Sequence, residues 1–432
     1  MGETAGAHGS IPRGGTAAAG AALAAAAPGR AEVRAGSAAD AVGGVRPGYV
    51  AEPGDAAAAA AVLRAAAEHG LAVVPRGNGT KIDWGNPPRR CDLVLATTAL
   101  TEIEHAVGDL VVRVGAGVGT AELQATLESA GQRLSVDTVV PGSTVGGMIA
   151  TGLSGPRRIL HGPLRDLVIG MTVLRADGVA ARSGGAVVKN VAGYDLAKLH
   201  TGAYGTLGVI TSVTFRLHPV PPALRLLRAT VPDPGALRDA AAAVLHSPTV
   251  PSAVELDWPA DGEPELAVLL EGTAAGLAAR GAAVAAVLPE PPRAADALPA
   301  GWGALPGAPG DTLVRLVAPV PEAVRVAGTV RETGRARGVP VAVRGSLGAG
   351  VLHAALPGDA APEAVAAVVA GARAALDGTP GGSVTVPHAA APVRAAGLDL
   401  WGAVPGAALM RAIKDRFDPD HRLSPGRLME GI

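Results

Sequence analysis

The sequence is short of cysteine, of aromatic residues and of net charge, and each shortage excludes a class of protein. Its single cysteine, Cys91, rules out an intrachain disulfide, and an iron–sulfur cluster needs about four thiolates. A net charge of −1 provides no basic surface for nucleic acid or anionic lipid. Aromatic residues make up 2% of the chain, and much of the 48% apolar content is alanine. No bulky apolar run is long enough to span a bilayer. We therefore expect neither a nucleic-acid partner nor an integral membrane segment.

The start of the chain also has few bulky residues. Residues 1–45 are rich in alanine and glycine, so we predict a disordered low-complexity tail that cannot bury enough apolar surface to offset its ordering entropy. Leu23 is the only strongly apolar residue of the run 17–27, and a twin-arginine pair is absent, which argues against a secretory signal. The expected location is the cytoplasm. The remaining length suits two or three domains.

The first glycine-rich loop follows a helix and a strand. Asp55 is a suitable N-cap for a helix over residues 56–68, Gly70 ends it, and an apolar strand follows at 71–74. The loop at 75–81 reads PRGNGTK. Its glycines expose backbone N–H groups, and its hydroxyl and cation complement a phosphate. The alternative is an ordinary surface turn, because a G-x-G pair alone is a weak signal.

Two more glycine-rich segments frame a sheet that we expect to be at least partly antiparallel. PGSTVGGMIATGLSG at 141–155 combines bare N–H groups with small residues, and GAYGTLG at 202–208 enters a strand at 209–217. Strands are also expected at 93–95 and 111–114, with a helix at 120–130. The pair Asp177-Gly178 separates strands at 167–174 and 179–182 and predicts a hairpin. A Rossmann domain would need parallel strands, and the glycines at 115–119 do not fit its fingerprint.

The region after residue 219 is predicted to form a second domain. Strands are expected at 253–258, 265–271, 312–318 and 341–344, and alanine-rich helices at 321–337 and 361–376. Glycine- and proline-rich loops at 301–310 and 378–382 separate them. This pattern indicates an α+β cap with an antiparallel sheet.

Five ordered motifs carry a family resemblance. PRGNGTK (75–81), PGSTVGGMIATGLSG (141–155), RDLVIGMTVLRADG (165–178), KNVAGYDLAKL (189–199) and GTLGVIT (205–211) resemble the FAD-binding domain of the vanillyl-alcohol oxidase and p-cresol methylhydroxylase (PCMH) superfamily. Within it the chain is most similar to the family of FAD-binding subunits of bacterial glycolate oxidase. LWG at 400–402, MRAIK at 410–414, FDP at 417–419 and SPGR at 424–427 resemble that family's closing segment, in which Asn usually replaces Ser424.

The resemblance implies the domain plan and the cofactor. It implies an α+β fold, in which a PCMH-type FAD-binding domain of two α/β subdomains (46–219) precedes a C-terminal FAD-linked oxidase-like cap domain (220–432). Some members attach FAD through a histidine at the place of Asn78, and an amide cannot form that bond. Non-covalent FAD is therefore expected, with His161 as an alternative attachment site. The implied cofactor-binding residues are Pro75, Arg76, Gly77, Asn78, Gly79, Thr80, Pro141, Ser143, Thr144, Gly146, Gly147, Thr151, Gly152, Gly155, Gly205 and Ile210.

One run in the cap domain bears on the chemistry. Relatives in the D-2-hydroxy-acid dehydrogenase branch carry G-H-x-G-D-G-N-x-H, which helps to bind metal and substrate. Residues 345–353 keep this spacing, but Ser346, Ala349 and Val351 replace the His, Asp and Asn. With only His353 left, and with the ten histidines showing no metal-ligand spacing, we expect no metal site and assign no catalytic residue. A chance match of this glycine run is the alternative.

The resemblance implies an FAD-binding subunit of a glycolate oxidase complex. A small 2-hydroxy acid would be oxidised there, glycolate to glyoxylate, with a second FAD subunit and an iron–sulfur subunit as partners and with peripheral membrane association only through them. Two alternatives stay open, namely a stand-alone FAD-dependent oxidase and a non-catalytic flavin-binding structural subunit.

Polar residues near the glycine segments have two interpretations each. Lys189-Asn190 and Tyr194-Asp195 either position their segment beside the flavin or form a structural turn in which Asp195 caps a short helix. Arg157, Arg158 and Arg165 either steer an anion or are solvated surface arginines, and we expect the latter.

Overall fold

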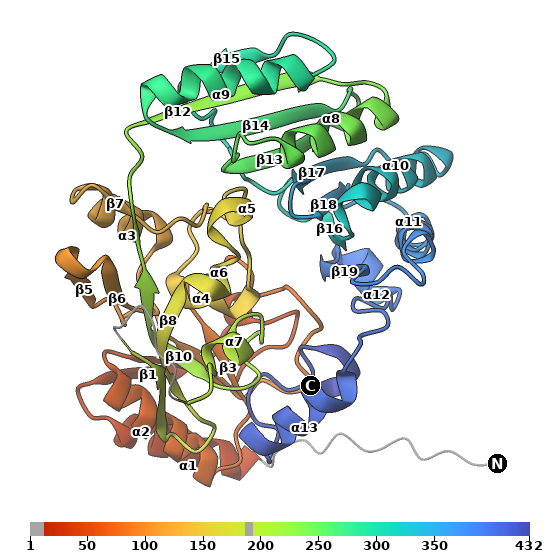
Figure 1. Ribbon diagram of the computed structural model, residues 1–432. Coiled ribbons are helices and arrows are strands. Elements are labelled where there is room, and N and C mark those ends of the chain that lie inside the picture. The colour runs from red at the N-terminus through yellow and green to blue at the C-terminus, as the bar shows by residue number, and fades with distance from the viewer. Residues whose placement is uncertain (1–12, 186–192) are drawn as a thin grey trace.

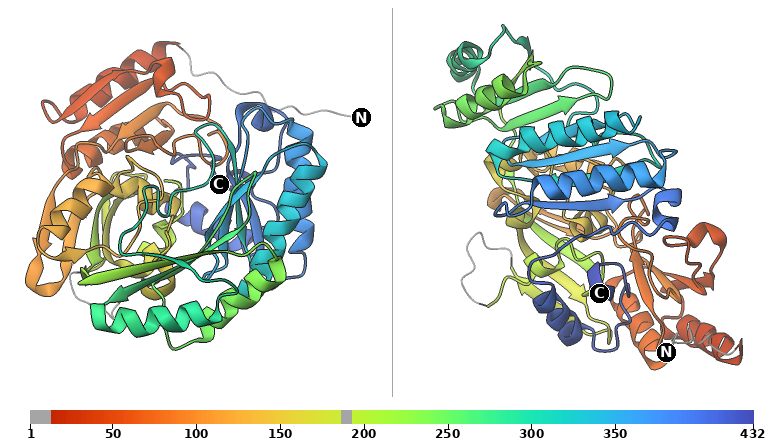
Figure 2. Two further views of the ribbon diagram at one scale, coloured as in Figure 1. Left: turned by 90° about the horizontal axis from the view of Figure 1, so that it is seen from above. Right: turned by 90° about the vertical axis from the view of Figure 1, so that its right-hand side faces the viewer.

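The computed structural model describes residues 13–185 and 193–432, and it shows two domains between which the chain passes at residues 217–222 and again at residues 396–406 (Figure 1). Lys189 and Asn190 lie outside these residues. The N-terminal domain holds a four-stranded and a five-stranded sheet, and the C-terminal domain holds an eight-stranded sheet. In Figure 2 the helices of the larger sheet cover the face turned away from the N-terminal domain, so the other face is turned toward it.

The four-stranded sheet is mixed. Its order is β1-β2-β4-β3, with β3 and β2 parallel to β4 and β1 antiparallel to β2. The Asp55 carboxylate accepts a hydrogen bond from the Ala58 N–H at 2.8 Å and caps α2, as predicted. Gly70 follows the helix with φ +61°. The elements are α1 (Arg13–Ala26), β1 (Ala31–Ala35), β2 (Tyr49–Pro53), α2 (Ala56–Glu68), β3 (Val73–Arg76) and β4 (Leu93–Ala96).

The predicted disorder of residues 1–45 is wrong for residues 13–45. Helix α1 packs against α2, with Leu23 fully buried and Ala19 2% exposed. The alanines that argued against a core permit a close approach of two helices, since small side chains leave little space between them. Asp40, 4% exposed, ends the 3-10 turn Ala38–Asp40 and pairs with Arg34 at 2.7 Å. The segment is therefore part of the N-terminal domain.

The five-stranded sheet is entirely antiparallel, with the order β5-β6-β10-β8-β9. The hairpin at Asp177-Gly178 is confirmed, and Gly178 has φ +75°. Fully buried Phe215 lies in the core beneath the sheet. The strands are β5 (Ile103–Ala106), β6 (Val111–Gly115), β8 (Val168–Leu174), β9 (Ala180–Gly184) and β10 (Val209–Arg216). The helices are α3 (Thr120–Glu128), α4 (Val145–Thr151), α5 (Arg158–His161), α6 (Leu164–Leu167) and α7 (Ala197–His200), and β7 (Gln132–Arg133) pairs with β11 (His218–Pro219).

The cap sheet is antiparallel in the order β15-β12-β14-β13-β17-β18-β16-β19. Its strands alternate between an apolar face under the helices and a face of mixed polarity toward the N-terminal domain, so Val254 and Leu256 enter the core while Glu255 does not. The strands are β12 (Ala223–Thr230), β13 (Ala253–Trp258), β14 (Glu265–Gly272), β15 (Arg293–Ala295), β16 (Thr312–Val317), β17 (Ala342–Ser346), β18 (Val351–Leu356) and β19 (Ser383–His388). The helices are α8 (Pro234–His246), α9 (Ala274–Val287), α10 (Val320–Ala336), α11 (Pro362–Ala375) and α12 (Ala391–Ala395).

The end of the chain returns to the N-terminal domain (Figure 1). After α13 (Ala407–Phe417), residues 422–424 lie parallel to β3: the Val73 N–H donates to the Arg422 carbonyl at 2.7 Å, and the Ser424 N–H donates to the Val73 carbonyl at 2.8 Å. The closing 3-10 turn is Met429–Gly431. The C-terminal motifs thus belong in space to the domain that carries the glycine loops.

Candidate functional site

The glycine segments converge on one pocket of the N-terminal domain. Residues from β3 and its loop, from α4 and from the turn before β10 line it, together with one residue near the C-terminus. Twelve of the predicted cofactor-binding residues lie there: Pro75, Arg76, Gly77, Asn78, Gly79, Thr80, Thr144, Gly146, Gly147, Thr151, Gly205 and Ile210. We call it the glycine-loop pocket.

The loop after β3 offers backbone donors to this pocket. Across the described chain, no residue accepts a hydrogen bond from the N–H groups of residues 77–80. The Asn78 amide donates to the Gly142 carbonyl at 2.9 Å and so ties the first glycine segment to the second. The Arg76 guanidinium pairs at 3.2 Å with Asp40 from the N-terminal segment. A hydrogen bond from Arg34 holds the pKa of the Asp40 carboxyl well below its usual range. The loop is therefore supported from two sides and leaves its own donors free for an anion.

A buried lysine supplies a positive charge beside the loop. Lys81, 8% exposed, donates to the Ser143 hydroxyl at 2.6 Å and to the Thr80 hydroxyl at 3.2 Å. No carboxylate pairs with it among the described residues, and burial lowers its pKa to about 8. The ammonium group thus has hydroxyl partners only, and a bound anion would complete its surroundings.

Helix α4 begins at the second glycine segment. Thr144 caps it by accepting from the Gly147 N–H at 3.2 Å. The Gly146 N–H donates to the Ala116 carbonyl at 2.8 Å, and a Cβ atom built at residue 146 would lie 2.9 Å from the Ala116 Cβ. Only glycine permits this contact, which brings α4 against the loop after β6. The glycine is thus required by the packing of the wall rather than by a ligand.

Two residues from distant parts of the chain complete the pocket. Tyr204 lines it with φ +52° and packs edge-on against Trp401, their ring centroids 5.7 Å apart. Arg427 is 4% exposed, donates to the Trp84 carbonyl at 2.6 Å, and has two buried nitrogens without a described partner. Burial lowers the pKa of Arg427 to about 10. Besides Arg76, which pairs with Asp40, the pocket therefore has two further cations, Lys81 and Arg427.

Four predicted residues do not line this pocket. Pro141 borders a neighbouring hollow, and buried Ser143 instead holds Lys81. Gly152 ends α4 with φ +64°, and Gly155 lies at the domain interface. Residue type alone cannot show which glycines of a motif end a helix and which face a pocket. Lys81, the cation that the sequence placed at the end of the first loop, also lines the pocket, whereas Thr97, Ala150, Tyr204, Gly208 and Arg427 line it without having been assigned from the sequence.

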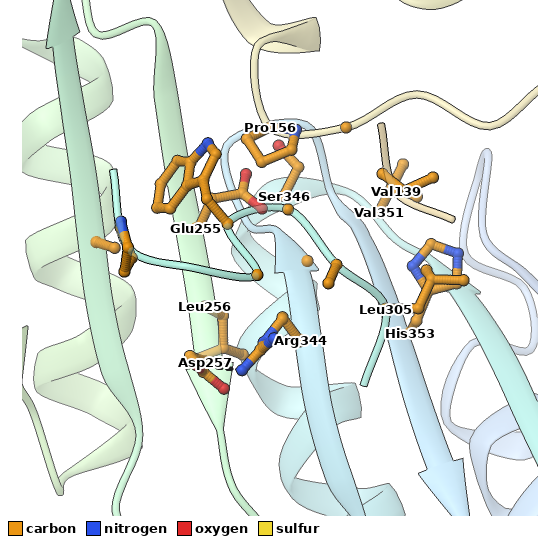
Figure 3. A pocket seen from close by; sticks show the side chains of 18 of the residues that line it. Val139, Pro156, Glu255, Leu256, Asp257, Leu305, Arg344, Ser346, Val351 and His353 are labelled. Carbon is orange, nitrogen blue, oxygen red and sulfur yellow. Dashed lines mark hydrogen bonds and ion pairs between the residues drawn. The ribbon is translucent and has the colours of Figure 1, made fainter. Parts of the chain in front are cut away.

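A second pocket, of about 310 Å³, lies between the domains (Figure 3). We call it the interdomain pocket. Glu255 and Ser346 lie side by side in it, and His353 lies on the other side next to Leu305. Each of the three polar side chains is less than 9% exposed, and each has a buried atom without a described partner. Burial raises the pKa of the Glu255 carboxyl well above its usual range. This pocket can accept a polar ligand that satisfies those atoms.

The degenerate glycine run forms the β17–β18 hairpin and brings its residues into this interdomain pocket. Burial, with the charges of Arg315 and Arg158, lowers the pKa of His353 to about 3, so its imidazole is neutral. Arg344 does not face the pocket as a free cation, because it pairs with Asp257 at 2.7 Å. In the described ranges no group of three or more His, Cys, Asp and Glu side chains is arranged to hold a metal ion.

The prediction of solvated arginines is wrong for two of the three positions. Arg157 is 14% exposed and pairs with Asp137 and, at 3.0 Å, with Glu271 of the cap. Arg158 is half-buried, and only Arg165 is exposed. Asp195 does not cap α7 but pairs with Lys198 at 2.9 Å. The burial of Arg157 could not be read from the sequence, because both of its partners come from distant strands or loops.

Two other residues have no place in the glycine-loop pocket. His161 lies against His218, with the ring centroids 4.4 Å apart. Tyr194 is 90% exposed. The structure describes no helix that is both long and apolar enough to cross a bilayer.

Two families of known domains match the chain. The FAD binding domain matches residues 47–194, and the C-terminal domain of FAD linked oxidases matches residues 293–428. The first contains the loop after β3 and helix α4 but not the turn before β10, and the second contains most of the cap sheet and the C-terminal return. These two stretches are therefore similar to an FAD binding domain and to the C-terminal domain of FAD linked oxidases.

Curated relatives match over part of their length. Glycolate oxidase subunit GlcD of Bacillus subtilis is 35% identical over 196 residues, 45% of this chain and 42% of that protein. Glycolate oxidase subunit GlcE of Escherichia coli is 43% identical over 125 residues, 28% of this chain and 36% of that protein. D-lactate dehydrogenase of Archaeoglobus fulgidus is 35% identical over 170 residues, 39% of this chain and 38% of that protein. The match spans about two fifths of each relative.

Solved structures match over nearly the whole chain. The 4-ethylphenol oxidase from Gulosibacter chungangensis has a TM-score of 0.72 at 14% identity, covering 96% of this chain and 97% of that one. A BBE-like protein of Physcomitrella patens has a TM-score of 0.70 at 14% identity, covering 94% and 97%. The predicted fold is confirmed: a PCMH-type FAD-binding fold of mixed α and β content with a C-terminal antiparallel sheet.

Proposed function

We propose that this chain, which carries an FAD-binding domain followed by the C-terminal domain of FAD linked oxidases, binds FAD without a covalent bond and serves as the FAD-binding subunit of a glycolate (2-hydroxy-acid) oxidase. The glycine-loop pocket is the observation that supports FAD as the cofactor. Its free N–H groups at residues 77–80 and its cations, Lys81 and Arg427, suit the pyrophosphate and the other polar groups of FAD. When bound, the flavin would supply the two-electron acceptor for oxidation of a C–H bond.

The side chains of the pocket support a non-covalent attachment of FAD. Asn78 is engaged with the Gly142 carbonyl, and no histidine is among the lining residues. His161, the alternative, contacts His218 near the domain interface instead. Precipitating the purified protein with acid should release its FAD into the supernatant. Flavin that stays with the denatured pellet after washing would contradict the non-covalent assignment, whereas a protein purified without any flavin would contradict FAD binding itself.

The electron path of the proposed complex needs partners. Cys91 is buried and free, and burial together with the charge of Asp92 raises its pKa to about 12, so a metal-binding thiolate is disfavoured there. We infer that an iron–sulfur subunit and a second FAD subunit receive the electrons. The names of the GlcD and GlcE relatives support this arrangement.

The substrate assignment is tested with the chain alone and with partners. As an accessory subunit, the isolated FAD-loaded chain should turn over glycolate or D-lactate poorly with an artificial acceptor, and co-expression with its partner subunits should restore turnover. The interdomain pocket favours a second candidate, a stand-alone FAD-dependent oxidase of 2-hydroxy acids. Robust turnover by the isolated chain, abolished by His353→Ala but with FAD retained, would decide for that candidate. A non-catalytic structural role would leave turnover of the assembled complex unchanged by the same substitution.

A further inference from the structure

Four buried polar atoms of the interdomain pocket have no hydrogen-bond partner in the described part of the chain. They are Glu255 Oε1, Ser346 Oγ, His353 Nε2 and Trp302 Nε1. Buried polar atoms are normally satisfied by the protein, by water or by a ligand, and each one left without a partner lowers stability. Four such atoms in one cavity indicate a site for a molecule that supplies the missing partners.

The strand register fixes how these groups are spaced. Glu255 of β13 stands opposite Ser346 of β17, and Ser346 stands opposite Val351 of β18. His353 lies two residues farther along β18 and therefore on the same face. With strands about 4.8 Å apart and a rise of about 3.4 Å per residue, the Cα atoms of Glu255 and His353 are about 12 Å apart. Figure 3 likewise shows Glu255 beside Ser346, and His353 on the other side of the pocket. A ligand that contacts both sides is larger than a two-carbon acid.

The cap loop at 299–305 covers the pocket, and each of its residues lines it. Trp302 packs against an apolar cluster that includes Ala267, another residue of the pocket wall. Gly303 has φ +72°, and a Cβ atom built there would lie 2.8 Å from Pro156 Cδ, so the loop closely approaches the N-terminal domain. The enclosed volume of about 310 Å³ lies at the lower end of the range of about 300–1,000 Å³ for small-molecule sites. It suits a molecule the size of a monosaccharide.

The lining residues offer no unpaired positive charge to an anion. Arg344 pairs with Asp257 at 2.7 Å, and Arg228 pairs with Glu265. These two arginines are the only arginine or lysine residues among the described residues that line the pocket. A 2-hydroxy acid would bury its carboxylate there without a counter-charge, which is unfavourable. The charge pattern therefore argues against the stand-alone oxidase of 2-hydroxy acids.

A cationic ligand is disfavoured as well. Burial raises the pKa of Glu255 well above its usual range, so the carboxyl is protonated and does not attract a cation. The charges of Arg315 and Arg158, together with burial, keep His353 neutral and would repel a cation, although neither arginine lines the pocket. A protonated carboxyl, a hydroxyl and a neutral imidazole can each donate or accept, whereas the Trp302 N–H only donates. Hydroxyl groups, which do both, complement all four.

We propose that the interdomain pocket binds an uncharged polyhydroxylated molecule of about monosaccharide size, held by hydrogen bonds to Glu255, Ser346, Trp302 and His353. None of the residues that line this pocket also lines the glycine-loop pocket. The inference therefore goes beyond the proposed function and does not depend on bound FAD.

Calorimetric titration of the full chain with glucose tests the site. Glucose should bind saturably, whereas glucuronate and glucosamine, which add a negative or a positive charge to the same ring, should bind at least about 10-fold more weakly. Ser346→Ala and His353→Phe should each raise the dissociation constant for glucose about 10-fold, because each leaves a ligand hydroxyl without its partner. Glu255→Gln should keep glucose binding, since an amide donates and accepts as a protonated carboxyl does, and Glu255→Leu should lose it.

The matched control is Ser252→Ala. Ser252 directly precedes β13 and is fully buried, and its hydroxyl lacks a described partner as that of Ser346 does, but it does not line this pocket. This variant should bind glucose as the wild-type chain does. The thermal unfolding midpoint of each unliganded variant identifies a substitution that merely unfolds the cap. Ser346→Ala should be at least as stable as the wild type, because it removes a buried polar atom that has no partner.

The site would be overturned if neither glucose nor sorbitol bound the wild-type chain, or if Ser346→Ala and Glu255→Leu both left the affinity for glucose unchanged. Tighter binding of glucuronate or glucosamine than of glucose would overturn the uncharged class of ligand. Titrating FAD-free protein separates this inference from the proposed function. If the chain binds no FAD but loses glucose binding on Glu255→Leu, the proposed function fails and this site stands.

Discussion

Lys414 and Asp418 form an ion pair with no solvent exposure, and their Nζ and Oδ2 atoms are 2.6 Å apart. Lys414 also donates to the Thr206 carbonyl at 2.7 Å, in the turn before β10, and to the Leu423 carbonyl at 2.8 Å. All three donors of the ammonium group are therefore used. The pair holds helix α13 and residues 422–424 against the wall of the glycine-loop pocket, which explains why the C-terminal motifs accompany the FAD-binding loops.

We expect Lys414→Met to unfold the C-terminal return. The substitution leaves the Asp418 carboxylate buried without a counter-charge, a loss of roughly 3–5 kcal/mol in the free energy of unfolding. Urea denaturation, followed by circular dichroism, measures this loss in the free energy of unfolding. The control is Lys198→Met, which removes an exposed pair with Asp195 and should cost less than about 1 kcal/mol. Equal losses in the two variants would contradict a structural role for the buried pair.

Glycine should be required at positions 77 and 146. A side chain at residue 77 would overlap the Thr144 hydroxyl that caps α4, and one at residue 146 would meet Ala116. Gly77→Val and Gly146→Val should therefore displace α4 and purify without FAD, as judged by the ratio of the flavin absorbance to the protein absorbance. The control Gly328→Val, in the middle of α10 with open space around it, should keep its FAD. Retention of flavin by both pocket variants would show that the loops tolerate the displacement.

Lys81→Met should weaken FAD binding while the fold survives. The variant removes the cation that the Ser143 and Thr80 hydroxyls hold beside the loop. Loss of one charge-assisted contact corresponds to about a 10- to 100-fold higher dissociation constant for FAD. Fluorescence titration of the apoprotein with FAD measures this dissociation constant. Because the methionine is buried where a desolvated ammonium had been, the apoprotein of the variant should be at least as stable as that of the wild type. An unchanged FAD affinity would show that Lys81 does not contribute to FAD binding.

Acid should weaken the contact between the domains through Glu271. Burial acts to raise its pKa, but hydrogen bonds from Arg133 at 2.6 Å and the charge of Arg157 outweigh burial and lower the pKa from 4.5 to about 2. A depressed carboxyl pKa contributes stability above the unfolded value near 4.5 and loses it as pH falls toward 2. Allowing for solvent screening, the contribution is about 2 kcal/mol.

Comparison with Glu271→Gln isolates that contribution. The free energy of unfolding should differ between wild type and variant at about pH 6 and converge as the pH approaches about 2. Urea titrations at several pH values provide both curves. A difference that stays constant over this whole range would mean that Glu271 titrates normally in the folded protein.

Local chemistry determined much of this protein from its sequence. The cap at Asp55, the Asp177-Gly178 hairpin and the strand at 253–258 depend on neighbouring residues, and the structure has each of them. The glycine motifs likewise predicted most of the pocket wall, because backbone that must pack closely excludes larger side chains. The two-domain order followed from the same motifs and from the strand and helix periodicity after residue 219.

Only the tertiary structure decided which distant residues share a site. Helix α1 is ordered because α2 covers its alanines, and no local pattern records that contact. Asp40 pairs with Arg76, and Arg427 lines the glycine-loop pocket. Secondary-structure propensity depends on neighbouring residues and cannot predict contacts over such sequence separations. Arg344 is neutralised by Asp257 whereas Arg315 has no partner in the described chain, a difference set by which strands are neighbours in the sheet. Charge pairing across strands is a property of register, and register exists only in the folded chain.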